Sequence, residues 1–177
     1  MRVGWDLDGV VYPFVESMRH VVLRRTRVGK PLPTPRQWEM WHDWQMTQDE
    51  WDDHFEAGVA DGSLFTFGGP MDHGTINAMH DTHSIHIVTH RPAAAHATTR
   101  AWLREHAIRY DTLTFSENKA SVDTHVFLDD KPENVEAVHK AGGLGILFDQ
   151  PWNQRAEGLR RVHSWRQFRD VVKEIGG

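Results

Sequence analysis

Residues 3–11, with the sequence VGWDLDGVV, decide how the rest of this chain is interpreted. An apolar run leads to Asp6, skips one residue to Asp8 and then reaches Gly9. If the run is a strand, both carboxylates lie at its C-terminal end on one face, because side chains at i and i+2 share a face. Converging carboxylates repel each other unless a cation lies between them, and Mg²⁺ is the hard ion that oxygen ligands favour. Calcium loops and plain turns also use Asp-x-Asp-Gly, so the interpretation depends on partners elsewhere in the chain.

The composition is that of a globular protein with one domain and room for a small insertion. The chain has 177 residues, of which 39% are hydrophobic and 25% are charged. No apolar run approaches the ~18 residues of a membrane span, and Asp6 and Asp8 interrupt the only candidate signal peptide. With 0 cysteines the chain has no disulfides or thiolate metal sites, and its net charge of −5 provides no general attraction to nucleic acid. We therefore expect a cytoplasmic protein that does not bind membranes and for which a nucleic-acid partner is unlikely.

Short apolar runs alternate with helical patterns through most of the chain. Besides the opening run, strands are predicted at residues 84–89, 110–115, 125–130 and 144–148. Helices are predicted at residues 13–27, 92–106, 132–142 and 164–174. This alternation indicates a parallel sheet with right-handed crossovers. The predicted fold class is therefore α/β, a three-layer Rossmann-like parallel sheet.

Residues 12–80 interrupt the alternation, because they are too long and too helical for one crossover. Residues 34–37 resemble a helix start with Thr34 as N-cap, and residues 47–50 repeat the capping-box pattern. We predict that residues 12–80 form a small helical cap, inserted into a core of residues 1–11 and 81–177. The predicted cap helices carry the aromatic residues Trp38, Trp41, Trp44, Trp51 and Phe55.

Polar side chains follow the ends of the predicted strands. Besides the two aspartates of the opening strand, Thr89 ends one strand, Asp129 and Asp130 end another, and Lys119 precedes the latter. Because the C-terminal ends of parallel strands share one edge of a sheet, these side chains can meet there. One carboxylate can attack phosphorus and a second can transfer protons, while a hydroxyl and a lysine hold phosphoryl oxygens. Distal carboxylates can complete a Mg²⁺ site.

Four short motifs resemble those of the haloacid dehalogenase (HAD) superfamily of phosphohydrolases, in the same order and over most of the chain. The motifs are DLDGV at residues 6–10, IVT at residues 87–89, Lys119, and FLDD at residues 127–130. The resemblance implies that Asp6 is a nucleophile that forms an aspartyl-phosphate and that Asp8 is the general acid/base. The aspartate at position 8, with this fourth motif, favours phosphatase over dehalogenase chemistry.

The resemblance also implies a Mg²⁺ site. Asp130 would be a direct ligand, with Asp129, Asp6 and the backbone carbonyl of Asp8 serving the same ion. Asp129 and Asp130 could instead cap the helix that begins at Pro132, since acids suit helix N-termini.

The resemblance implies that phosphate is bound by a lysine and by residues at the C-terminal end of the second predicted strand and directly after it. The candidates are Thr89, His90, Arg91 and Lys119. Arg91 could equally be a surface residue, and Lys131 and Lys140 are alternatives to Lys119.

A narrower resemblance is to the 5'(3')-deoxyribonucleotidase family, which places a small helical cap between the first two motifs. It is carried by DGVVYPF at residues 8–14, DDKPENV at residues 129–135 and FDQPWN at residues 148–153. The family's aromatic residue six positions after the acid/base aspartate lies near the base, and Phe14 takes that place. The resemblance implies a Mg²⁺-dependent phosphoric monoester hydrolase of the 5'-nucleotidase type, acting on (deoxy)nucleoside monophosphates.

Two other functions remain open from the sequence: a polynucleotide end phosphatase and a non-catalytic nucleotide-binding module. Residues 35–61 carry 8 acidic residues against one basic residue, Arg36, and would repel a phosphate backbone. Basic residues do precede this segment, namely Arg19, Arg24, Arg25, Arg27 and Lys30. The intact Asp6 and Asp8 argue against a non-catalytic module. The aromatic cap could also pack against a second copy, so a homodimer is among the expectations.

Overall fold

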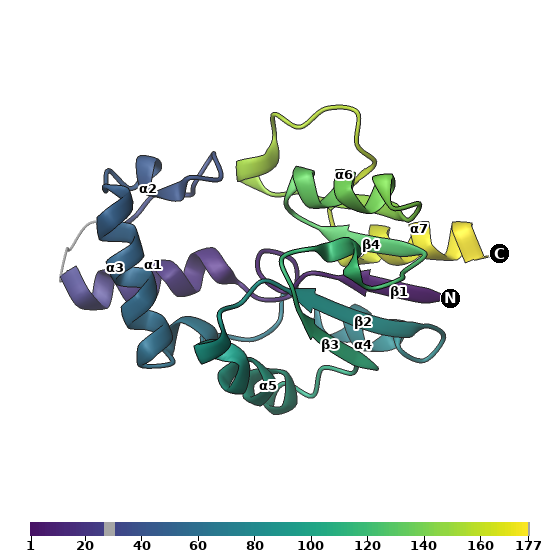
Figure 1. Ribbon diagram of the computed structural model, residues 1–177, viewed down its shortest axis with the longest axis horizontal. Helices are drawn as coiled ribbons and strands as arrows, with labels where there is room; N and C mark the ends of the chain where they lie inside the picture. Colours follow the sequence, from purple (N-terminus) through teal and green to yellow (C-terminus); the bar gives the residue numbers. More distant parts are fainter. Residues whose placement is uncertain (27–30, 177) are drawn as a thin grey trace.

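The computed structural model describes residues 1–26 and 31–176 (Figure 1). Its centre is a six-stranded sheet in the order β3-β2-β1-β4-β5-β6, with every neighbouring pair parallel. The strands are β1 (Arg2–Trp5), β2 (Ser84–Thr89), β3 (Thr112–Phe115), β4 (Val126–Asp129), β5 (Leu144–Phe148) and β6 (Arg161–Val162). The predicted α/β class with a parallel Rossmann-like sheet is confirmed. The edge strand β6 was not predicted, because two residues are too few to show an alternating pattern.

Strand β1 lies at the centre of the sheet, between β2 and β4. Val3 and Trp5 are fully buried, as expected for a parallel strand covered on both faces. The Trp5 ring packs edge-on against Trp165, with ring centroids 5.0 Å apart. Directly after β1, the backbone N–H of Asp6 still donates to the carbonyl of Leu128 at 3.0 Å. Asp6 is therefore fixed at the C-terminal edge of the sheet by the same ladder that holds β1.

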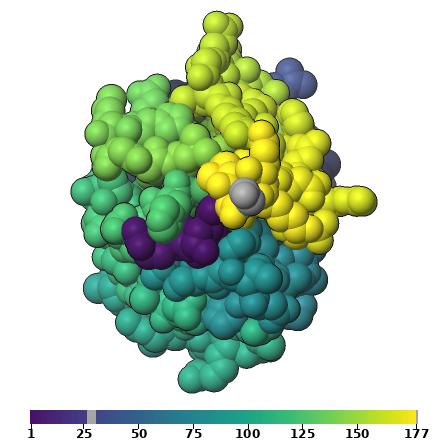
Figure 2. Space-filling view, turned by 90° about the vertical axis from the view of Figure 1, so that its right-hand side faces the viewer, coloured from purple at the N-terminus to yellow at the C-terminus, as the bar shows by residue number. Residues whose placement is uncertain are grey.

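Helices cover both faces of the sheet and complete three layers (Figure 1). Together with the cap helices, the helices are α1 (Phe14–Thr26), α2 (Met40–Asp43), α3 (Gln48–Ala60), α4 (His73–Met79), α5 (His96–Glu105), α6 (Pro132–Lys140) and α7 (Trp165–Gly176). Helix α6 packs against β4 and β5, whereas α4 packs against α7. Right-handed crossovers that run in opposite directions from β1 place α4 and α6 on opposite faces. Figure 2 looks onto the end of the molecule away from the cap, where the N-terminal residues and α7 lie side by side.

The helical segment between β1 and β2 extends beyond the C-terminal edge of the sheet, on the left in Figure 1. Helices α1 and α3 pack against each other and against the 3₁₀ helix η1 (Ser63–Phe65). Helix α4 belongs to the same stretch of chain but contacts α7 of the core. We therefore propose that the cap proper ends near η1 and that α4 is part of the core layer.

The capping-box prediction for α3 is confirmed, because Thr47 and Glu50 bond each other's backbone N–H groups. The predicted helix start at residues 34–37 is wrong, since the helix begins only at Met40. Side-chain bonds from residues that lie 7 and 11 positions away accompany this non-helical form. Asp43 accepts from the backbone N–H of Arg36 at 2.7 Å, and the Trp44 indole donates to the carbonyl of Pro33 at 2.8 Å. Within residues 1–26 and 31–176, no helix has the length and apolar character needed to cross a membrane.

Candidate active site

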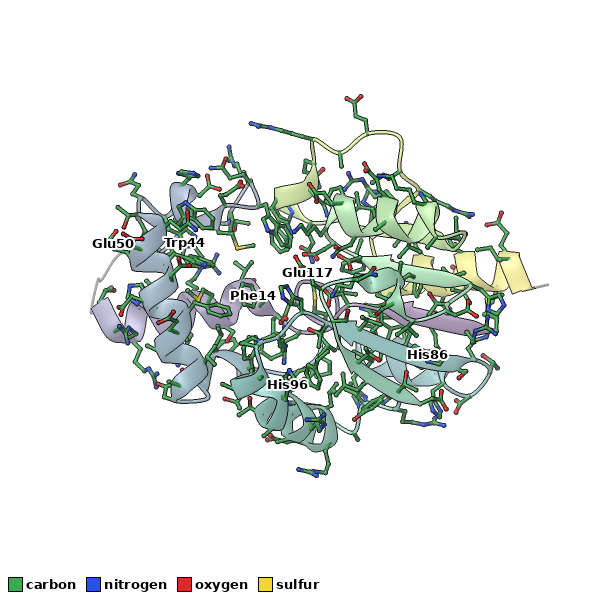
Figure 3. The ribbon with its side chains drawn as sticks, viewed as in Figure 1. Phe14, Trp44, Glu50, His86, His96 and Glu117 are labelled. Carbon is green, nitrogen blue, oxygen red and sulfur yellow. The ribbon has the colours of Figure 1, made fainter. Side chains whose placement is uncertain are left out.

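A cavity of about 280 Å³ opens between the C-terminal edge of the sheet and the cap. Its core side is mostly polar and its cap side mostly aromatic, and Figure 3 shows Phe14 and Glu117 in the region between the cap helices and the sheet. The core contributes Asp6, Asp8, Gly9, His90, Glu117, Lys119, Asp130, Lys131, Asn134 and Trp152. The cap side contributes Phe14, Trp38, Met40, Trp41, Trp51, Phe55 and Phe65. Chain segments far apart in sequence therefore build one site.

Asp6 lies at the floor of this cavity and is held by two donors. The backbone N–H of Leu7 and the ammonium group of Lys119 each donate to Asp6 Oδ1, both at 2.8 Å. Lys119 also donates to the carbonyl of Val88 at 2.8 Å, and its side chain is only 2% exposed. Burial alone would lower the pKa of Lys119, but the surrounding carboxylates outweigh it and raise that pKa. Lys119 is thus a fixed positive charge that leaves Asp6 Oδ2 without a hydrogen bond from the described residues.

Three buried carboxylates gather beside this pair. Asp6, Asp129 and Asp130 each offer an oxygen within 4.8 Å of the other two. Burial and the neighbouring carboxylate of Asp6 raise the pKa of Asp129 to about 7. Burial, together with Asp129 and Asp6, also raises the pKa of Asp130 well above its ordinary value. The concentration of negative charge is therefore unfavourable in the protein alone.

The donor set fits a divalent cation. Asp130 Oδ2 accepts from the Trp152 indole at 2.9 Å, but the buried Oδ1 has no hydrogen-bond partner among the described residues. A buried polar atom without a partner is costly and needs an explanation. A cation among the three carboxylates would bind that oxygen and offset the mutual repulsion that, after burial, raises the pKa values of Asp129 and Asp130. Asp129 is more fully engaged, because it accepts from the Lys131 backbone N–H and the Asn134 amide.

The turn after β1 carries Asp8 over the same cavity. Gly9 has φ +75°, a left-handed conformation that glycine adopts without steric cost. A Cβ at Gly9 would overlap the carboxylate of Asp130, so the position is also too close to the site for a larger residue. The carbonyl of Leu7 accepts from the N–H groups of Val10, Val11 and Tyr12, which closes the turn.

Asp8 is bound by Arg91 through two parallel hydrogen bonds. Arg91 Nη2 donates to Asp8 Oδ1 at 2.7 Å and Nε donates to Oδ2 at 3.0 Å. The Arg91 side chain is 0% exposed, whereas that of Asp8 is 25% exposed and lines the cavity. The structure therefore places Arg91 behind Asp8 rather than on the cavity wall.

The remaining predicted phosphate residues lie at the end of β2. His90 lines the cavity. Thr89 is fully buried, and its hydroxyl has no hydrogen-bond partner among the described residues. Thr89 does not line the cavity, but it ends β2, the strand that pairs with β1. Lys140 lies at the last turn of α6 and does not line the cavity, whereas Lys131 does.

The sequence did not show which cap tryptophans face the site, and the structure distinguishes those that line the cavity from those that do not. Trp38, Trp41 and Trp51 line the cavity, whereas Trp44 packs in the cap core and is 5% exposed. Asn134 and Trp152 were missed as site residues, although both stand in the quoted motifs at residues 129–135 and 148–153. The indication in the sequence that Glu117 is a site residue was weaker, namely its position two residues before Lys119.

Comparison with known proteins identifies the family. The profile of the family described as "5' nucleotidase, deoxy (Pyrimidine), cytosolic type C protein" matches residues 1–175. The chain belongs to this family. A Chlorobaculum tepidum protein whose name assigns it to the 5'(3')-deoxyribonucleotidases is 30% identical to this nucleotidase, over 97% of this chain and 89% of its own.

Solved structures agree with this nucleotidase in fold. YfnB from Bacillus subtilis, described as a HAD-hydrolase bound to magnesium, has a TM-score of 0.64 at 11% identity, over 97% of this chain and 98% of its own. The haloacid dehalogenase-like family protein SP0104 from Streptococcus pneumoniae has a TM-score of 0.64 at 10% identity, over 97% of each chain. The profile match confirms the predicted nucleotidase family, and the solved structures confirm the predicted HAD-type fold. The chain is a phosphoric monoester hydrolase of the nucleotidase type on a HAD fold.

Proposed function

We propose that this nucleotidase is a Mg²⁺-dependent 5'(3')-deoxyribonucleotidase that hydrolyses deoxyribonucleoside monophosphates through an aspartyl-phosphate on Asp6. The observation that carries the proposal is the placement of Asp6. Leu7 and Lys119 fix Oδ1 on the cavity floor, and Oδ2 is left to attack phosphorus. The name of the Chlorobaculum tepidum relative supports the substrate class.

Two carboxylates with different surroundings suit the two steps of this reaction. In the first step Asp6 Oδ2 attacks phosphorus, the bond from phosphorus to the ester oxygen breaks, and Asp8 gives a proton to the departing oxygen. In the second step Asp8 takes a proton from water, whose oxygen attacks phosphorus and restores the Asp6 carboxylate. Asp8 can reach both oxygens because its side chain lines the cavity beside Asp6.

The chain offers several groups for the phosphoryl oxygens. The Lys119 ammonium and the unpartnered Thr89 hydroxyl are the donors that we propose for them, and His90 is a further donor on the cavity wall. Mg²⁺ held by Asp6, Asp130 and the backbone carbonyl of Asp8 would offset the charge of a phosphate that faces several carboxylates. Asp129 would act less directly, since both of its oxygens already accept hydrogen bonds from Lys131 or Asn134.

The aromatic cap side suits a nucleobase. A planar base can stack on Phe14 or on a tryptophan such as Trp38, a residue that is 43% exposed. The cavity volume of about 280 Å³ is close to the lower end of the ~300–1,000 Å³ typical of small-molecule sites. A mononucleotide is therefore a better occupant than a polymer.

A polynucleotide substrate is disfavoured by charge. Of the basic residues that precede residues 35–61, Arg24 pairs with Asp61 and Arg25 pairs with Asp53, so these two do not form a free basic groove. Arg27 and Lys30 of that predicted cluster lie outside the described residues. Glu117 adds a negative charge to the cavity wall and would repel a second phosphate.

The direct test measures phosphate release from deoxyribonucleoside 5'- and 3'-monophosphates with Mg²⁺ or with EDTA. We expect Mg²⁺-dependent release by the native protein and none by Asp6→Asn, which keeps the shape but removes the nucleophile. Asp149→Asn is the matched control, since Asp149 follows β5 at the same sheet edge but pairs with Arg161 outside the cavity.

A second arm compares mononucleotides with end-phosphorylated oligonucleotides at two salt concentrations. A strong, salt-sensitive preference for oligonucleotides would replace the proposal with an end phosphatase. Equal background release by the native protein and Asp6→Asn, with or without Mg²⁺, would point to a non-catalytic binding module instead.

A further inference from the structure

Arg91 is a buried cation that makes three side-chain hydrogen bonds inside the protein. One N–H from each of its three nitrogens is engaged: Nε and Nη2 bind Asp8, and Nη1 donates to the Thr99 hydroxyl at 3.1 Å. Its side chain is 0% exposed and does not line the cavity. A phosphate in the cavity would thus not contact the Arg91 side chain as it is placed here. The structure therefore argues against direct phosphate binding by this residue.

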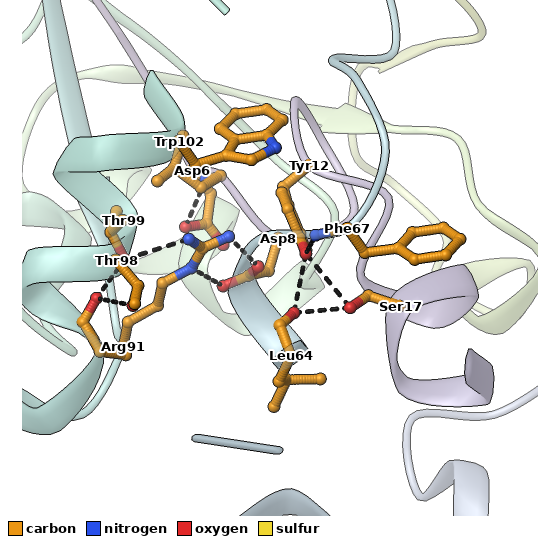
Figure 4. A network of polar contacts seen from close by, with 12 residues as sticks. Asp6, Asp8, Tyr12, Ser17, Leu64, Phe67, Arg91, Thr98, Thr99 and Trp102 are labelled. Atoms are coloured by element: carbon orange, nitrogen blue, oxygen red, sulfur yellow. Dashed lines mark hydrogen bonds and ion pairs between the residues drawn. The ribbon is translucent and has the colours of Figure 1, made fainter. Parts of the chain in front are cut away.

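Figure 4 shows Arg91 paired with Asp8 and Tyr12 nearby, and two aromatic rings hold the Arg91 guanidinium in place. Its central carbon lies 4.5 Å from the ring centroid of Tyr12 and 4.2 Å from that of Phe65. The Tyr12 hydroxyl donates to the carbonyl of Leu64 at 2.7 Å and accepts from the backbone N–H of Phe67 at 2.8 Å. Both rings are buried, so the guanidinium has little freedom to turn. Arginine stacks well on aromatic faces and matches a carboxylate in a planar fork, and neither feature is shared by lysine.

We propose that Arg91 is a positioning residue that holds the Asp8 carboxylate in the orientation from which it transfers protons. The proposal rests on the proton-transfer role that the proposed function gives to Asp8. A bidentate arginine uses one lone pair on each carboxylate oxygen, of about four lone-pair sites in all, and leaves the others free. Asp8 is 25% exposed on the cavity side, so those free sites face the substrate.

The same contacts connect Asp8 to the cap. Phe65 belongs to η1, lines the cavity and packs on Arg91 with its ring. A substrate that presses on Phe65, or a shift of η1, therefore acts on the group that orients Asp8. The proton-transfer geometry depends in this way on how the cap is seated, although no cap residue bonds Asp8 directly among the described residues.

The leaving group of the substrate tests this inference. An alkyl phosphate such as a nucleoside 5'-monophosphate needs a proton on its departing oxygen, whereas 4-nitrophenyl phosphate releases a stable phenolate with little assistance. The quantity to compare is kcat/KM, which reports the steps up to departure of the leaving group. For Arg91→Lys, which cannot form the fork, we expect about a 100-fold loss with the nucleotide. With the nitrophenyl ester we expect a loss of less than about threefold, because general-acid assistance matters little there.

Two neighbouring threonines supply a gentler variant and its matched control. Thr99 and Thr98 both donate to the carbonyl of Ala95, at 2.7 and 2.9 Å, but only Thr99 also accepts from Arg91. Thr99→Val removes the third anchor of the guanidinium without touching Asp8. We expect Thr99→Val to lower kcat/KM for the nucleotide by about 10-fold, in line with a modest displacement of a proton-transfer group. Thr98→Val should leave both substrates unchanged.

The outcomes separate the possible roles. Equal losses with both substrates and a higher KM for each would show that Arg91 binds phosphate, and would overturn the proposal. If Thr99→Val and Thr98→Val lower the melting temperature by the same amount and lose the same activity, the threonine has a structural role only. That result would also overturn the proposal. An inactive native protein with both substrates would instead overturn the proposed function itself and the inference with it.

Discussion

Replacing Asp129 with asparagine should stabilise the metal-free protein at alkaline pH, although it removes a group of the site. Asp129 is 0% exposed, and burial together with Asp6 raises its pKa to about 7 from the ordinary 3.8. Below pH 3.8 the Asp129 carboxyl is protonated in both the folded and the unfolded chain, so its ionisation does not change the free energy of unfolding. Between 3.8 and about 7 only the folded chain keeps the proton, so the free energy of unfolding falls as the pH rises. Above a pH of about 7 the ionised Asp129 carboxylate destabilises the folded chain by the full amount.

The size of this cost follows from the pKa difference. The interval from 3.8 to about 7 corresponds to about 4 kcal/mol at about 1.4 kcal/mol per pH unit. Asparagine keeps one acceptor for the Lys131 N–H, but its NH₂ group replaces the acceptor that faces Asn134, which costs about 1 kcal/mol if the Asn134 amide does not turn. The expected gain of Asp129→Asn at pH 8 is therefore about 3 kcal/mol, with little or no gain below pH 4.

Urea unfolding in EDTA, at several pH values between 4 and 8, measures the effect. Asp149→Asn is the control of opposite sign. Burial would raise the pKa of Asp149, but hydrogen bonds from Gln154, His163 and Arg161 outweigh it and lower that pKa. Asp149→Asn should therefore destabilise the protein at pH 8. A loss of stability in Asp129→Asn that is the same at pH 5 and pH 8 would refute the electrostatic reasoning.

Three further predictions concern the turn, the lysine and the cap. Gly9→Ala places a side chain at φ +75° against Asp130, so we expect loss of phosphatase activity and about 1–2 kcal/mol of destabilisation from the backbone alone, measured by urea unfolding. Lys119→Met leaves a buried carboxylate unpaired and should destabilise the protein by about 3–5 kcal/mol, measured by thermal unfolding. The variant should also lose nearly all activity. Full activity would contradict the phosphate-binding role. Trp38→Ala should raise KM for nucleotides with little change in melting temperature, whereas Trp44→Ala should cost about 3–5 kcal/mol of stability because that ring is buried. Equal destabilisation by the two tryptophan changes would show that Trp38 is part of the cap core.

Local patterns in the sequence were enough for most of the fold. The apolar run before Asp6 gave the central strand, and the capping box at Thr47 gave the start of α3. Pro132 after two aspartates gave the start of α6, where proline lacks the N–H that a first helical turn leaves unpaired. These features depend on residues a few positions apart, so they can be recognised in the sequence without the tertiary contacts. The edge strand β6 depends on pairing with β5 and has no such local pattern.

The sequence by itself determined that acidic strand ends in a set order would meet at one edge of a parallel sheet, because parallel strands with right-handed crossovers leave no other arrangement. Only the tertiary structure decided which partners those groups received. Arg91 binds Asp8 across 83 positions, and Trp38 lines the cavity whereas Trp44 does not. Those outcomes depend on how the cap is seated on the core. Packing between distant segments sets that arrangement, and no short-range periodicity encodes it.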